Sequence, residues 1–102
     1  MGLKEVRARA INCLDNGQVQ HETERSGEID KKNLLVTAQV SLDDVKELIS
    51  CTKGTQHEVS PHHADRLIEV HTLKPTKKGM KWYIKFYFLE PDIIFISVHL
   101  NE

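Results

Sequence analysis

Apolar residues recur at helical spacing in two stretches of the chain and alternate with polar residues in its C-terminal third. The first helical stretch covers residues 3–15, and Asn16-Gly17 follows it as a stop signal. Ser41 is a favourable N-cap for the second helix, whose buried stripe ends before Gly54. The pattern therefore predicts two amphipathic helices.

The other patterned segments are short and are typical of strands. They are residues 18–23, 34–40 (a helical turn being the alternative), 67–73, 80–89 and 93–100. Residues 24–33 are charged and predict a mobile loop, while residues 53–66 predict a long loop and residues 74–79 a turn. Together these elements predict one α+β domain over residues 1–102, with a small antiparallel sheet of three or more strands packed by two helices.

Composition agrees with one small globular domain. The 102 residues are 39% apolar and 28% charged, which is ordinary for a folded protein. No apolar run approaches the roughly 20 residues of a membrane span, and the N-terminus lacks the apolar region of a signal peptide. We expect a cytoplasmic protein without a membrane partner, in which Cys13 and Cys51 are free, buried thiols.

Charge is unevenly distributed along the chain. The net charge of −1 argues against a nucleic-acid partner, but five lysines and no acid lie between His71 and Tyr87. These lysines are Lys74, Lys77, Lys78, Lys81 and Lys85. A local basic stripe attracts phosphates even in a neutral protein. The alternative is a solvated edge strand that lysine protects from aggregation.

The strand at residues 80–89 has two chemically different faces. Met80, Trp82, Ile84, Phe86 and Phe88 share one face, which is expected to join the core. Lys81, Tyr83, Lys85 and Tyr87 share the other face. Cations interleaved with aromatic rings suit single-stranded RNA, because ammonium groups bind phosphates and rings stack on bases. The alternative is a solvent-exposed face whose tyrosines cover part of the core.

Pairing with the strand at residues 93–100 decides what joins that face. A loop at residues 89–93 pairs Phe88 with Ile94 and Tyr83 with His99, whereas a loop at residues 89–92 pairs Trp82 with His99. The first register is preferred because it unites Ile94, Ile96, Val98 and Leu100 with the apolar face of the neighbouring strand. Tyr83, Lys85 and His99 then share a face with Ser97 beside them, and Glu69 and His71 join if their strand pairs alongside.

Such a cluster suits RNA cleavage without a metal ion or other cofactor. Histidine serves as acid or base near neutral pH, and a fixed ammonium stabilises charge on the phosphorane. His99 is the candidate base or acid, Tyr83 and Lys85 bind the phosphate, and His62 or His63 is a mobile partner from the loop. The metal alternative has the ligands Cys51, His57, His62, His63 and His71, but it lacks the paired spacing of zinc sites.

Several segments resemble the MqsR-type toxins, which are RelE-like mRNA interferases of type II toxin–antitoxin modules. Residues 16–19, 42–45, 69–75, 79–85 and 96–99 read NGQV, LDDV, EVHTLKP, GMKWYIK and ISVH. The resemblance covers about residues 7 to 99, and its most specific part is the Tyr-x-Lys strand followed by Ile-Ser-x-basic. It implies a RelE-like α+β fold, metal-independent cleavage of mRNA, free or on the ribosome, and silencing by a cognate antitoxin.

The resemblance also implies roles for individual residues. Tyr83 matches the family's active-site tyrosine, Lys53 matches an active-site lysine, and His99 stands where the family has a terminal lysine. The expected RNA-binding residues are Lys53, Lys74, Lys77, Lys78, Lys81 and Tyr87. The chain departs from the family in its neutral charge, its longer histidine-rich loop and His99. A non-enzymatic protein-binding module, immunity-like or an adaptor, that uses the same sheet face is therefore the alternative to an endoribonuclease.

Overall fold

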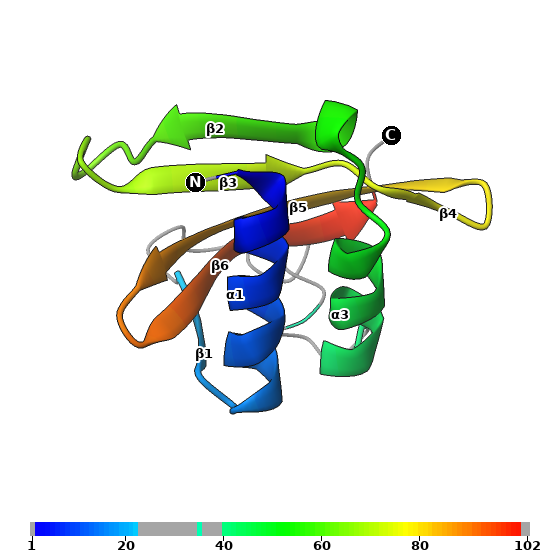
Figure 1. Cartoon of the computed structure of the whole chain (residues 1–102), viewed down its shortest axis with the longest axis horizontal. Coiled ribbons are helices and arrows are strands. Elements are labelled where there is room, and N and C mark those ends of the chain that lie inside the picture. The colour runs from blue at the N-terminus through cyan, green and yellow to red at the C-terminus, as the bar shows by residue number, and fades with distance from the viewer. Residues whose placement is uncertain (1, 23–34, 36–39, 101–102) are drawn as a thin grey trace.

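Two helices lie side by side across one face of a six-stranded sheet (Figure 1). The computed structural model describes residues 2–22, 35 and 40–100. The elements are α1 (Leu3–Asp15), β1 (Val19–His21), α3 (Leu42–Ser50), the single 3₁₀ turn η1 (Gly54–Gln56), β2 (His57–Pro61), β3 (Glu69–Leu73), β4 (Thr76–Lys77), β5 (Met80–Leu89) and β6 (Asp92–Leu100). The α+β class is confirmed.

Both helices form where their apolar spacing predicts. The buried residues of α1 are Val6, Ala10, Cys13 and Leu14. Ser41 caps α3 as expected: its hydroxyl accepts from the Asp44 N–H, and its own N–H donates to the Asp44 carboxylate. The predicted loop at residues 24–33 and most of the predicted strand at residues 34–40 lie outside the described residues.

The sheet is mixed, so the prediction of an antiparallel sheet is wrong in one respect. The main strand order is β1-β6-β5-β3-β2, and β4 pairs with the start of β5. β1 runs parallel to β6, with Val19 opposite Ile93, while the other pairs are antiparallel. A parallel pair needs a long crossover connection. The connection from β1 to β6 contains α3 and most of the chain. No local pattern in the sequence indicates that these two strands pair.

The predicted loop at residues 53–66 contains a strand. β2 pairs with β3 over five residues, from His57 opposite Leu73 to Pro61 opposite Glu69. All of β2 except His57 is exposed, so the segment has no alternation of buried and exposed positions for a sequence pattern to detect. This strand fixes where the loop that carries His62 begins.

The hairpin of β5 and β6 contains both of the registers that the sequence offers. Tyr83 lies opposite His99 and Lys85 opposite Ser97, which confirms the preferred pairing at that end. The register then shifts by one between Lys85 and Phe86, so that Phe86 lies opposite Phe95. Ile96 is the extra residue of the resulting β-bulge.

The bulge corrects the expected faces of β6. Ile93 and Phe95 lie with Val98 in the main core, under the helices, together with Phe86. Ile94 and Ile96 instead form a small apolar cluster with Val70 and Tyr87. We call the sheet side that carries this cluster, Tyr83 and Lys85 the second face. It lies opposite the side that α1 and α3 cover.

Two further expectations concern the cysteines and the membrane. Cys13 and Cys51 are both free thiols, as expected, but only Cys13 is buried, because Cys51 follows the last turn of α3 at the surface. Burial raises the pKa of the Cys13 thiol.

Neither α1 nor α3 combines the length and apolar character that a membrane-crossing helix requires.

Candidate functional site

Tyr83 and His99 form a stacked pair at one end of the second face. Their strands place them directly opposite each other, and the ring centroids are 5.0 Å apart with an interplanar angle of 15°. Both side chains are partly exposed. The pair therefore offers a phenol and an imidazole side by side to a ligand on this face.

A hydrogen bond fixes which nitrogen of His99 carries the proton in the neutral ring. Nδ1 lies 2.8 Å from the carbonyl oxygen of Leu100. Because a carbonyl oxygen only accepts, Nδ1 must donate, and Nε2 keeps its lone pair. Neutral His99 thus has the tautomer that a general base needs.

Lys85 lies two residues along β5 from Tyr83, on the same face and opposite Ser97. Thr72 of β3 is its neighbour on the other side. Lys85 is partly exposed, whereas Ser97 and Thr72 are buried. Lys85 is therefore positioned near the stacked pair by strands on both sides.

A groove of about 380 Å³ connects Lys85 with the loop after β2. Its lining residues are Pro61, His62, His63, Val70, Lys85 and Ile96. This volume is within the range of small-molecule sites. The loop histidines of the sequence hypothesis thus lie on the same face as Lys85, although 22 or more residues separate them from it in the chain.

His62 is buried in this loop, with 7% of its surface exposed, and its ring makes a T-shaped contact with that of Tyr87, with the centroids 4.7 Å apart. Its Nδ1 accepts a hydrogen bond from the Ala64 N–H at 3.0 Å, so in the neutral ring Nε2 carries the proton. Nε2 lies 3.5 Å from Oε1 of Glu22 but makes no hydrogen bond of good geometry. His63 stacks on His62 at 4.5 Å and is exposed.

Of the two histidines, His63 is exposed and His62 is buried, so the expectation of a mobile partner fits His63 better than His62. His62 is anchored by its packing, by the Ala64 contact and by its own N–H, which donates to the Ile68 carbonyl at 2.9 Å. The position of Tyr87 also differs from the expectation of an RNA-binding residue. It is 9% exposed and covered by His62, so its ring is not available as a base-stacking surface.

The lysines expected to bind RNA are dispersed. Lys74 pairs with Glu58 at 3.3 Å and Lys77 with Glu47 at 2.6 Å. Lys53, Lys78 and Lys81 are exposed, at η1, in the β4–β5 turn and at the start of β5. Only Lys81 follows the alternation of Tyr83 and Lys85 along β5. The basic stripe of the sequence is therefore not one continuous surface.

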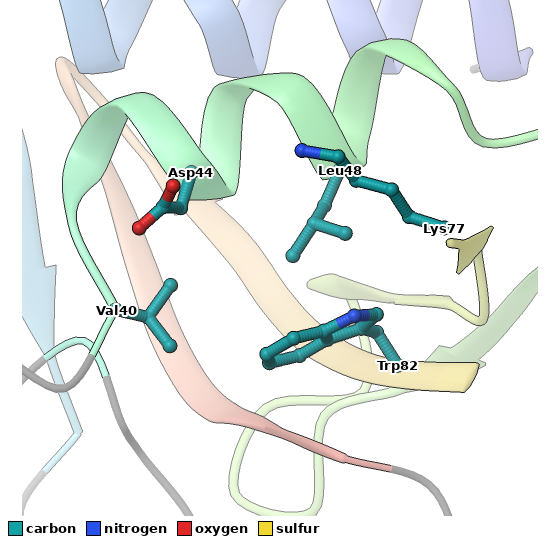
Figure 2. A pocket seen from close by; sticks show the side chains of 5 residues that line it. All are labelled: Val40, Asp44, Leu48, Lys77 and Trp82. Carbon is teal, nitrogen blue, oxygen red and sulfur yellow. The ribbon is translucent and has the colours of Figure 1, made fainter. Parts of the chain in front are cut away.

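Lys77 lies on the helix side of the sheet, at a second hollow of about 220 Å³ (Figure 2). Figure 2 shows the indole of Trp82 below Leu48, with Val40 and Asp44 at the other end. The charged groups here already have partners, since Lys77 pairs with Glu47 and Asp44 caps α3. We therefore place the candidate site on the second face.

His71 does not join the second face, which corrects the expectation for it and for Glu69. It lies opposite Phe86, on the helix side, and its Nδ1 is 3.1 Å from Nε2 of His57. Burial, and next the neighbouring His57, lower the pKa of His71 to about 4. The proposed metal ligands are thus split, because His57 and His71 pair on one side of the sheet and His62 and His63 lie on the other.

Sequence reasoning missed Glu22. Its N–H donates to the Phe95 carbonyl at 2.9 Å, which extends the parallel pairing of β1 with β6 and brings the carboxylate to the second face. Forty residues separate it from His62. The only signal in the sequence is the polar segment of residues 18–23, which was predicted to be a strand. Nothing in that segment identifies β6 as its partner.

Comparisons with known proteins add no family assignment. The sequence matches no protein-family model, and no curated protein matches it.

Proposed function

We propose that this protein is a metal-independent endoribonuclease of RelE-like fold that cleaves mRNA, acting as the toxin of a type II toxin–antitoxin module in the cytoplasm. One observation carries the proposal: the second face presents a stacked Tyr83–His99 pair, with Lys85 beside it at the mouth of the histidine-lined groove. The partners are mRNA, free or on the ribosome, and a cognate antitoxin.

The chemistry follows from the positions of these groups. Nε2 of His99 takes the proton of an RNA 2′-hydroxyl, whose oxygen attacks the adjacent phosphorus. The 2′-O–P bond forms and the P–O5′ bond breaks, which leaves a 2′,3′-cyclic phosphate and a 5′-hydroxyl. Lys85 and the Tyr83 hydroxyl stabilise the charge of the phosphorane. No step requires a metal ion.

His63 is the better candidate for the acid that protonates the leaving 5′-oxygen. It is exposed and can carry a proton without losing a partner, whereas Nδ1 of His62 is occupied by the Ala64 N–H. His62 acts instead as a positioning residue. It supports the groove wall against Tyr87.

A protein-binding module is the second candidate, and the groove supplies the observation that favours it. Pro61, Val70 and Ile96 contribute apolar surface beside the polar residues. A mixed apolar and polar groove suits a protein partner, and the net charge of −1 gives RNA no long-range attraction.

The decisive experiment is incubation of purified protein with mRNA and EDTA, with and without ribosomes. We expect cleavage that leaves cyclic phosphate ends. His99→Ala should lower the rate by about 10²–10⁴-fold, the range for loss of a general base, and Tyr83→Phe should lower it less. Lys85→Ala should also reduce cleavage, whereas Lys77→Ala, an equal loss of charge on the helix side, should not.

Wild-type protein that leaves mRNA intact under both conditions would rule out the nuclease and leave the binding module. Growth arrest on expression, relieved by co-expression of a neighbouring gene, tests the toxin–antitoxin part separately. Circular dichroism of each variant shows that loss of cleavage does not come from unfolding.

A further inference from the structure

We propose that Glu22, His62 and His63 form a binding site for a zinc ion at the end of the groove. One donor atom from each side chain lies within 4.8 Å of the others. The three residues come from the end of β1 and from the loop after β2, so the fold and not the local sequence assembles them. This inference goes beyond the proposed nuclease and does not depend on it, although a zinc ion on His63 would prevent that residue from acting as the acid.

The burial of the cluster distinguishes it from a chance group of surface residues. The side chains of His62 and Glu22 are only 8% and 12% exposed. The Nε2 atom of His62 is buried, faces the Glu22 carboxylate, and has no hydrogen-bond partner among the described residues. A buried polar atom without a partner costs free energy, and coordination of a cation would remove that cost.

The donor set selects the metal. Two imidazoles and one carboxylate suit zinc and other late first-row ions, whereas magnesium and calcium prefer oxygen ligands alone. Three protein ligands leave the fourth position of a tetrahedral zinc ion open. His62 and His63 also line the groove with Lys85, so water or a small anion in the groove could fill that position.

Metal binding must change the protonation of His62. In the free protein the Ala64 N–H donates to Nδ1, so the proton is on Nε2, where the metal would bind. Zinc displaces the Nε2 proton, and a neutral ring then carries its proton on Nδ1. Two N–H groups cannot face each other, so the Ala64 peptide must turn away. Binding is therefore coupled to a local change at Ala64.

Titration calorimetry with Zn²⁺ and absorption spectroscopy with Co²⁺, both on the full chain, test the site. We expect one ion per chain, a tetrahedral Co²⁺ spectrum, and a shifted Ala64 amide signal in NMR spectra of the zinc-bound protein. Loss of outer partners alone weakens metal sites roughly 10- to 100-fold, so loss of a direct ligand in Glu22→Gln or His63→Gln should cost at least about 100-fold. His99→Gln removes a histidine outside the cluster and should leave the affinity unchanged.

Both ligand variants preserve side-chain size or lie at the surface, so they should fold even if a change at the buried His62 does not. Absence of saturable binding would overturn the site. Binding that survives Glu22→Gln and His63→Gln, or that His99→Gln weakens equally, would also overturn it. None of these measurements uses RNA, so a failed zinc site and a failed nuclease give different results.

Discussion

The two faces of β5 carry aromatic rings in opposite surroundings. On the helix side Phe86 is fully buried, with Phe88 and Phe95 against it at centroid distances of 5.6 and 5.8 Å. On the second face Tyr83 stacks on His99 and both remain partly exposed. Strand alternation thus places Phe86 in the core and Tyr83 where a ligand can reach it, while Tyr87, also on the second face, is buried under His62.

The histidines repeat this contrast. His71 is 1% exposed, contacts another histidine, and is kept neutral by burial, which lowers its pKa to about 4. His99 has one nitrogen held by a carbonyl and the other left with its lone pair. The same residue type therefore serves packing on one face and is suited to proton transfer on the other.

The largest stability effect should come from the helix side. Phe86→Ala removes a fully buried ring and should lower the free energy of unfolding by about 3–5 kcal/mol. Leu89→Ala, on the same strand but 55% exposed, is the matched control and should cost far less. Urea denaturation measures both. Equal losses would mean that β5 is not divided into buried and exposed positions in this way.

Acid should lower the stability of the fold through protonation of His71. Its pKa is about 4 in the folded chain and near 6.5 when unfolded, so the unfolded chain binds more protons between these values. Stability should therefore fall as pH drops from about 6.5 to 4, by roughly 3 kcal/mol, and then stop changing through this group. Denaturation across this range measures the slope. His71→Phe should reduce the slope to the part from His57, whose pKa burial also lowers, and His99→Gln should leave it unchanged; an unchanged slope in His71→Phe would contradict this account.

Strong local patterns were sufficient for several predictions. The bounds of β5 are those predicted, because residues 80–88 alternate between an apolar set and a set of lysines and tyrosines, and Glu90-Pro91-Asp92 then breaks the strand. The pairing of Tyr83 with His99 was also predicted correctly, from hydrophobic matching. The faces of Ile93 and Phe95 were wrong because a bulge at Ile96 changes the parity of β6, and both faces of that strand are apolar enough to tolerate it.

The rest depends on pairings between distant segments. The side of the sheet on which His71 lies follows from the register of β3 against β5, which continues the β4–β5 register set at the Lys78-Gly79 turn, whereas the sequence prediction gave that turn only as residues 74–79. Glu22 reaches the second face only through the parallel pairing of β1 with β6. Candidate chemistry along one strand could thus be predicted from the sequence, whereas the groove and its carboxylate could not.

A smaller loss of unfolding free energy should come from the N-cap of α3 than from the core, and still less from an exposed position in the sheet. Ser41→Ala removes the hydroxyl that caps α3 and should cost about 1 kcal/mol of unfolding free energy. Ser60→Ala, at an exposed position of β2, is the control and should change stability little. Thermal unfolding of both variants checks this. A cost for Ser41→Ala no greater than for the control would mean that sheet packing alone holds α3 in place.

The smallest expected effect concerns charge, and it rests on the proposed RNA binding. Lys85 lies on the second face beside the stacked pair, while the Lys77 ammonium lies 2.6 Å from Glu47 on the helix side. If RNA binds the second face, Lys85→Ala should reduce the slope of log affinity against log salt by roughly 0.7, the value for one phosphate contact on a single strand. Lys77→Ala should leave the slope unchanged. Affinity measurements with a short single-stranded RNA at several salt concentrations separate the two, and an equal change in both variants would mean that RNA does not distinguish the faces.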